Sequence, residues 1–379
     1  MKKVLFSLIM ALFAVPVFAV EFESGEFKAN IYGEIYGDAF YTYSEGYGES
    51  SNSFGSQTFV GSSLLGIELS YGNVSGTFEA GLGDPVRRYF LTYRIGGAED
   101  HYLVVGRDTT IAAYSFGMVS NDFQALNDLG TLADNRRLQI RYGLNGFELA
   151  VVIPSLGGAW NADNTDDTGY KLSITDTEGN PLYTVFNVLP RIELAYTYAT
   201  DALEFKVFGA YGAYMYSDNS KIASDKVFHS YNVGFGGQAN FGNSFLQFTG
   251  WYGANLDLMD ALGNYQSRVV SVQNNKISMF LEDGVTKAEN IQSAGVAIGL
   301  GHTFNEKYTP QIGVGYTLNF GDGYEKMDDS LGAYLNCVIQ INDWFAITPE
   351  IAYINKMQDS TGAQEGYDFI AGAMASVVF

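Results

Sequence analysis

Basic side chains are concentrated in one stretch of this sequence. Seven of the nine arginines lie between residues 87 and 141, namely Arg87, Arg88, Arg94, Arg107, Arg136, Arg137 and Arg141. Inside the same stretch, segment 111–135 carries only acids as charged residues, namely Asp122, Asp128 and Asp134. Opposite charges that lie close together create a local field that attracts and orients charged solutes. The chemistry that this stretch offers is therefore electrostatic.

Covalent chemistry has little support. His101, His229 and His302 lie far apart and form no H-x-x-x-H spacing, so no metal site is indicated. Cys337 lies in an apolar stretch and is read as a small packed residue. No serine, histidine and acid or amide stand in a recognisable catalytic arrangement. The sequence thus predicts a protein that is not an enzyme, with no metal and no cofactor.

Composition narrows the class of protein further. The 379 residues include 44 Gly, 27 Tyr and 27 Phe but only 7 Pro, and 17% are charged. Glycine and aromatic residues with few charges favour many half-apolar strands. The formal net charge of −21 makes the chain a poor nucleic-acid ligand, because phosphate binding needs Lys and Arg.

The first residues look like an export signal. Lys2 and Lys3 precede an apolar run from Val4 to Val17, and a small-residue end follows at Ala19. This pattern predicts a cleaved signal peptide at 1–19. Composition does not shift along residues 20–379, so we expect a single exported domain there.

The main structural signal is a period of two residues, which repeats along the chain. In 308–320, apolar and aromatic residues occupy the even positions, and polar or glycine residues occupy the odd ones. Successive side chains of a strand point to opposite faces, so each such strand has one apolar face.

Tight turns and longer connections alternate. Seven tight turns are expected near 72–73, 96–99, 144–146, 200–202, 242–243, 305–307 and 342–343. Eight other connections lie at 44–56, 84–86, 111–135, 157–188, 217–227, 255–290, 321–330 and 356–366. Fifteen connections join sixteen antiparallel strands. Short turns at one end and long loops at the other are typical of an all-β transmembrane barrel, whose closure leaves no free sheet edge in lipid.

Two long connections leave the strand count open. Segments 170–186 and 265–281 each resemble a hairpin. If each hairpin protrudes above the rim, the barrel has sixteen strands; if one of them crosses the membrane, it has eighteen.

The alternation also sorts the arginines. Arg88, Arg94, Arg107, Arg137 and Arg141 are assigned to the lumen, because an outward arginine at mid-membrane costs about 2–4 kcal/mol. Arg87 and Arg136 have the opposite parity but lie at strand ends. The predicted wall charges nearly balance, so the acids of segment 111–135 favour a weak preference for cations.

Three segments resemble the Gram-negative general porins. Residues 31–37 (IYGEIYG) resemble the first strand of that family, 101–109 (HYLVVGRDT) the fifth, and 137–142 (RLQIRY) the strand that follows. The resemblance implies a homotrimer in the outer membrane, with a long third loop folded into the lumen. It also implies a pore constriction in which Asp122 and Asp128 face arginines on the wall. The alternative is that the wall arginines pair with Glu34, Glu68 or Glu79.

The end of the sequence supports the same family. Phe369, Ala371, Ala373, Ala375, Val377 and Phe379 alternate, and the terminal Phe379 is similar to the signal that the barrel-assembly machinery reads. The resemblance implies passive diffusion of small hydrophilic solutes and ions, with outer-membrane lipid and lipopolysaccharide around the barrel. A substrate-selective channel for a sugar or an anion, and a barrel used as an adhesin or anchor, are the alternatives.

Overall fold

The computed structural model describes most of the chain from residue 20 onward. The described residues are 20–46, 49–57, 61–81, 86–119, 126, 129–133, 135–153, 171–175, 181–218, 227–256, 279–282, 285–288, 290–321, 324–359 and 361–379. The predicted signal peptide at 1–19 lies outside them.

The described residues are almost entirely β-structure. The strands are β1 Val20–Ser24, β2 Phe27–Gly46, β3 Glu49–Gln57, β4 Leu64–Tyr71, β5 Val74–Gly81, β6 Arg88–Arg94, β7 His101–Thr109, β8 Arg136–Leu144, β9 Phe147–Val152, β10 Lys171–Thr175, β11 Pro181–Ala199, β12 Leu203–Asp218, β13 Val227–Phe241, β14 Ser244–Ala254, β15 Met279–Glu282, β16 Val285–Ala288, β17 Ile291–His302, β18 Tyr308–Gly321, β19 Asp328–Asn342, β20 Phe345–Asn355 and β21 Tyr367–Val378. A short 3₁₀ turn, η1 Ile95–Gly97, joins β6 to β7. Among these residues, no helix is long and apolar enough to cross a membrane.

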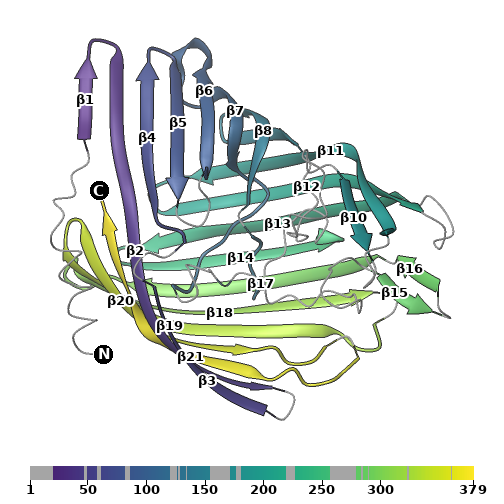
Figure 1. Ribbon diagram of the computed structural model, residues 1–379. Helices are drawn as coiled ribbons and strands as arrows, with labels where there is room; N and C mark the ends of the chain where they lie inside the picture. The colour runs from purple at the N-terminus through teal and green to yellow at the C-terminus, as the bar shows by residue number, and fades with distance from the viewer. Residues whose placement is uncertain are drawn as a thin grey trace.

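The strands close into a ring (Figure 1). Each strand pairs antiparallel with the next, in the order β2, β4–β9, β11–β14 and β17–β21. The ring closes where β21 pairs with β2, from Glu34 opposite Val378 to Glu45 opposite Tyr367. Within the described part of the chain, this makes a closed sixteen-stranded antiparallel barrel, so the predicted fold is confirmed.

The seven tight turns lie where the sequence predicts them. In the turn between β8 and β9, Asn145 and Gly146 have φ angles of 51° and 81°. This left-handed pair suits the two-residue turn that joins Leu144 to Phe147, and asparagine and glycine adopt it most easily. The long connection expected at 44–56 is different: β2 continues to Gly46 and β3 begins at Glu49, so the hairpin is extended.

The hairpin expected at 170–186 forms without adding a strand to the ring. β10 pairs with the loop-side part of β11, from Lys171 opposite Phe186, while β11 itself continues into the barrel wall. The eighteen-stranded alternative is therefore not adopted. Residues 265–278 of the second expected hairpin lie outside the described residues, and β15 and β16 form a separate two-stranded sheet.

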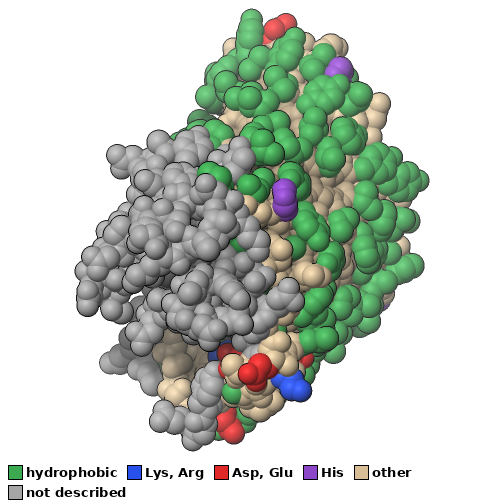
Figure 2. Space-filling model, turned by 90° about the vertical axis from the view of Figure 1, so that its right-hand side faces the viewer, with side chains coloured by type: hydrophobic (Ala, Val, Ile, Leu, Met, Phe, Trp, Pro, Cys, Tyr) green, Lys and Arg blue, Asp and Glu red, His purple; other side chains and the backbone are tan. Residues whose placement is uncertain are grey.

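The outer surface of the barrel is apolar, and Figure 2 shows hydrophobic side chains covering one flank, with charged side chains at its margins. Leu91, Ile140, Leu194 and Val233 are 46–61% exposed although they lie within strands. Most of their neighbours along each strand point inward and are polar or small, such as Gln139, Glu193, Ala195 and Asn232. A closed sheet with an apolar outer belt is built to be surrounded by lipid.

The strands of the barrel wall fall into two groups by length. Strands β4–β9, which we call the low wall, have six to nine residues each. Strands β11–β14 and β17–β20, the high wall, have eleven to nineteen. Figure 1 shows the short strands β4–β8 in purple to blue and the long ones in teal to yellow. A tilted membrane strand needs about 9–11 residues, so most strands of the low wall fall short of that span.

The two faces of β11 make a first prediction. Leu194→Arg would place a charge in the hydrocarbon at a cost of about 2–4 kcal/mol, so we expect a strong loss of folded barrel in the membrane. Thr197→Arg, on the lumen side of the same strand, should assemble normally. Heat-modifiability on gels measures both variants, and equal assembly would mean that the faces are assigned the wrong way round.

Candidate functional site

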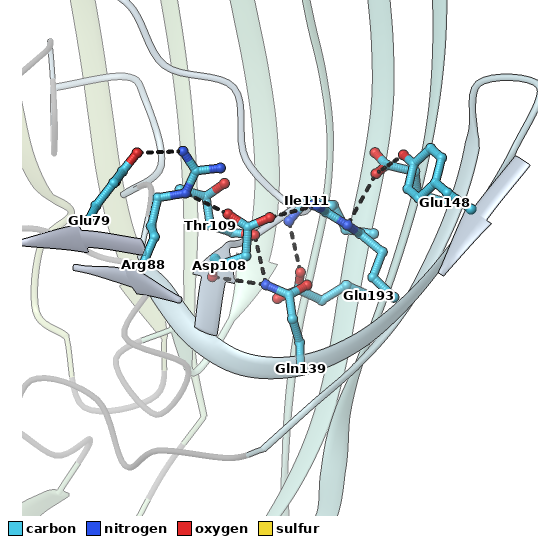
Figure 3. A network of polar contacts seen from close by, with 10 residues as sticks. Glu79, Arg88, Asp108, Thr109, Ile111, Gln139, Glu148 and Glu193 are labelled. Carbon is cyan, nitrogen blue, oxygen red and sulfur yellow. Dashed lines mark hydrogen bonds and ion pairs between the residues drawn. The ribbon is translucent and has the colours of Figure 1, made fainter. Parts of the chain in front are cut away.

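A chain of alternating charges crosses the lumen side of the low wall. Glu79 on β5 accepts from Arg88 Nη1 on β6 (3.0 Å), and Arg88 Nε donates to Asp108 Oδ1 on β7 (2.7 Å). The other carboxylate oxygen of Asp108 accepts from Arg141 Nη2 on β8 (2.6 Å). Arg141 Nε lies 3.5 Å from Glu148 Oε1 on β9. We call these five residues the charge ladder, and Figure 3 shows the part around Arg88 and Asp108.

A tyrosine lies at each end of the charge ladder. The Tyr32 hydroxyl donates to Glu79 (2.9 Å), and the Tyr102 hydroxyl donates to Glu148 (2.8 Å). The two rings lie over Gly66 and Gly143 of the neighbouring strands, where a Cβ atom would meet the ring carbons. Glycine thus allows each phenol to lie along the wall and to reach its carboxylate.

Strand register explains why the charge ladder is continuous. Glu79 lies directly opposite Arg88. Asp108 lies opposite Arg137 and pairs with Arg141, four residues further along β8 on the same face. Cross-strand partners and alternate residues of a strand share a face of the sheet, so lumen-facing side chains of five neighbouring strands can reach one another. Arg88 and the end member Glu148 are partly open to solvent, with 30% and 16% of their side chains exposed, whereas Glu79 at the other end is 5% exposed.

The structure brings together only part of the predicted arginine set. Arg88 and Arg141 belong to the charge ladder, and Arg137 faces the lumen beside it, donating to the Arg136 carbonyl (2.9 Å). Arg94 lies opposite Tyr102 on the lumen face, but at the tight-turn end of β6, six residues from Arg88.

Arg107 differs from its predicted position. It lies opposite Tyr89 and Leu138, which are both 39% exposed on the outer face, and it donates to the Val86 carbonyl at the loop end of the strand. Asp108 faces the lumen in its place. The alternation of apolar and polar residues does not identify the outer face of β7, because both faces are apolar. Tyr102 and Val104 lie on the inner face, and Leu103 and Val105 lie on the outer face.

The predicted acidic side of the constriction, Asp122 and Asp128, lies outside the described residues, and so does Asp134. The arginines of the charge ladder pair with wall carboxylates, among them Glu79, which the sequence offered as the alternative. Asp108 and Glu148 were not among the expected partners. In the described part of the chain, no group of histidine, cysteine and acidic residues could hold a metal ion.

The described parts of the third loop, 110–119, 126 and 129–133, lie against the high wall. Phe116, Met118, Leu126 and Leu129 pack with Tyr334, Ile354 and other wall residues in one apolar cluster. Ile111, Ala112, Ala113 and Leu132 pack in a second cluster with Phe208, Trp251 and their neighbours. Where the loop passes β18, a side chain on Gly315 would collide with the Leu129 carbonyl, so glycine permits this close approach.

Wall side chains also bond the backbone of this loop. Glu193 accepts from Ile111 N (2.9 Å), and Glu350 accepts from Val119 N (2.8 Å). Asn232 and Lys206 donate to the carbonyls of Ala112 (3.0 Å) and Ala113 (3.1 Å). Thr317 accepts from Gly130 N (2.7 Å), and Trp251 donates to the Gly130 carbonyl (3.0 Å). Six strands of the high wall therefore supply these bonds.

These wall residues were not recognised as loop anchors from the sequence. Glu193, Thr317 and Glu350 are 0–3% exposed, which is unusual for polar residues on the face that lines a water-filled lumen. Their alternation marks them as lumen-facing, but their burial depends on the loop that covers them.

Burial, and secondly the Glu204 carboxylate, raises the pKa of the loop residue Tyr114 to about 12, so this phenol stays neutral.

No protein-family model matches the chain, and no curated protein matches it. Several solved structures do match the chain. The outer membrane channel DcaP of Acinetobacter baumannii is 14% identical, with 94% of this chain and 99% of that chain covered and a TM-score of 0.68. OmpT of Vibrio cholerae, an outer membrane protein, is 11% identical over 95% and 100% of the two chains (TM-score 0.55), and a trimer form of it has a TM-score of 0.50. An anion-selective porin from Comamonas acidovorans is 12% identical over 93% and 100% (TM-score 0.53).

At these identities the likeness shows the fold. The predicted resemblance to the Gram-negative porins is confirmed at that level, and the apolar belt fits the outer membrane in which such barrels lie.

The loop anchors make a second prediction. Thr317→Val keeps the side-chain shape but leaves Gly130 N–H buried without its acceptor, at a cost of about 1–3 kcal/mol. We expect normal assembly but noisier single-channel current, because the loop loosens from the wall. Thr197→Val, also on the lumen face, is the matched control, and identical current noise in the two variants would show that Thr317 does not hold the loop.

Proposed function

We propose that this barrel is an outer-membrane porin through which small hydrophilic solutes and ions diffuse passively. The observation that carries the proposal is the unequal burial of polar side chains inside the ring. On the high wall they are buried under the third loop. On the low wall, Glu79 and Asp108 are buried by their arginine partners, but Arg88, Arg141 and Glu148 keep 14–30% of their side chains exposed. An aqueous path along the low wall accounts for both facts.

The charges along this path favour a weak preference for cations. Three carboxylates of the charge ladder face its two guanidiniums and the neighbouring Arg137, so these charges balance, and one further acid makes the sum negative. The lumen-facing Glu68 lies nearby on β4 and is exposed. Rings and rows of fixed charge set the ion preference of a pore, and salt screens them. The cation preference should therefore be modest and should fall as the salt concentration rises.

Purified protein in a planar lipid bilayer tests this function, which makes the third prediction. We expect stepwise conductance increases, a reversal potential on the cation side in a salt gradient, and a smaller preference at 1 M salt than at 0.1 M salt. Saturable block by one particular solute would favour a substrate-selective channel instead. A folded barrel that gives no conductance would favour an anchor or adhesin.

We also propose a homotrimer packed through the low wall. Its strands are short for a lipid-facing wall, yet their outer residues, such as Leu65, Leu91 and Ile140, are apolar and 55–61% exposed. Neighbouring copies would cover this face without the length that lipid requires. The trimer form known for OmpT of Vibrio cholerae supports the proposal.

A matched pair of variants makes the fourth prediction. Leu91→Lys on the low wall should convert the trimer on unheated gels into folded monomer. Val233→Lys on the high wall should instead reduce the amount of folded barrel, because this face meets lipid. If Leu91→Lys behaves like Val233→Lys, the low wall faces lipid and the trimer is assembled elsewhere.

The remaining partners follow from the position of the barrel. We propose that outer-membrane lipid and lipopolysaccharide surround the high wall, and that Phe379 is read by the barrel-assembly machinery. Phe379 exchanges both backbone hydrogen bonds with Gly33 (2.9 and 3.0 Å), and its ring lies over that glycine. It therefore belongs to the seam at which the barrel closes.

A further inference from the structure

Arginines on a pore wall ordinarily attract anions, yet two of the arginines here are bound to one acid. Asp108 accepts from Arg88 with one carboxylate oxygen and from Arg141 with the other, at 2.7 and 2.6 Å. Its side chain is 2% exposed. Glu79 and Glu148 each contact a single guanidinium of the charge ladder. Asp108 is therefore the member through which both positive charges are compensated.

Side chains of neighbouring strands hold the backbone at and after Asp108 by hydrogen bonds. Gln139 Nε2 donates to the carbonyls of Asp108 (2.8 Å) and Thr109 (2.9 Å), and Gln139 is 3% exposed. Two residues further on, Glu193 holds the Thr110 hydroxyl and the Ile111 amide. Figure 3 shows Gln139 and Glu193 both reaching the backbone of this junction. The backbone that carries the Asp108 side chain is thus held by Gln139 of β8 and, two to three residues further on, by Glu193 of β11.

We infer that Asp108 sets the sign of the ion preference of this pore, by compensating Arg88 and Arg141 together, and that Gln139 is its positioning residue. Arg137, opposite Asp108 on the same face, adds a third guanidinium, so loss of the Asp108 charge changes the local balance from three acids against three bases to two against three. The guanidiniums of Arg88 and Arg141 then present charge to the path along the low wall. The inference rests on the proposed function, because ion preference requires a conducting pore.

The test compares two acid-to-amide changes on the lumen face. Asp108→Asn removes one negative charge from the centre of the charge ladder, and Glu68→Gln removes one from an exposed side chain outside it. At 0.1 M salt we expect Asp108→Asn to lower the cation-to-anion permeability ratio about three- to fourfold, which turns the weak cation preference into an anion preference. Glu68→Gln should lower the ratio by less than half as much, because water screens that charge.

Further variants separate charge from shape. Asp108→Glu should keep the sign of the preference, and Gln139→Leu should shift the ratio in the same direction as Asp108→Asn but less far. Arg141→Gln should shift it toward cations. The double variant Asp108→Asn/Arg141→Gln removes one charge of each sign, and its ratio should return close to that of the wild type. This pair decides the question if Asp108→Asn alone does not assemble.

The possible failures are distinguishable. A folded wild-type barrel without conductance overturns the proposed function. A conducting wild type whose permeability ratio is unchanged by Asp108→Asn, or changed equally by Glu68→Gln, overturns the role of Asp108. A double variant that behaves like Arg141→Gln alone overturns it as well.

Discussion

The whole structure depends on one constraint: a backbone surrounded by lipid must pair every N–H and C=O group within the protein. The ring of strands meets this constraint, and its closure between β2 and β21 removes the last free edge of the wall there. On the same edge of β2, beyond the end of β21, the short strand β1 folds back and pairs with residues 27–31. Because closure puts one face of every strand outside, the alternation of side chains becomes an apolar belt and an inner wall.

A related constraint applies to the third loop, because the described part of its backbone is buried against the inner wall rather than surrounded by lipid, and buried N–H and C=O groups also need partners. Its described backbone runs across the high wall, away from the regular ladders, and side chains of that wall supply the missing partners. The barrel wall therefore positions the loop, and apolar side chains such as Phe116 and Leu129 add contact area. A loop held at several strands forms a fixed lining, which leaves the low wall as the surface beside the proposed aqueous path.

That surface carries charges that largely compensate one another. An unpaired guanidinium or carboxylate that is nearly buried would cost several kcal/mol, so alternating charges across neighbouring strands stabilise the inner wall as well as set its field. Asp108 contributes both to the stability of the inner wall and to its electric field, since it is almost fully buried and contacts two arginines. The ion preference of the proposed pore then follows from a small difference between opposing charges rather than from an excess of arginine.

Alternation and turn residues are local properties of the chain, so the sequence by itself was enough to predict the barrel, its seven tight turns and the face on which Leu194 or Arg88 lies, but it left sixteen and eighteen strands open. Alternation is ambiguous where both faces of a strand are apolar, so Arg107 was assigned to the wrong face of β7 and Asp108 was not recognised as facing the lumen. The pairing of Arg88 and Arg141 with Asp108, and the burial of Glu193 and Glu350 under the loop, depend on residues up to 231 positions apart. Only closure of the ring and folding of the loop onto the high wall bring such residues together, which is why the tertiary structure alone decided them.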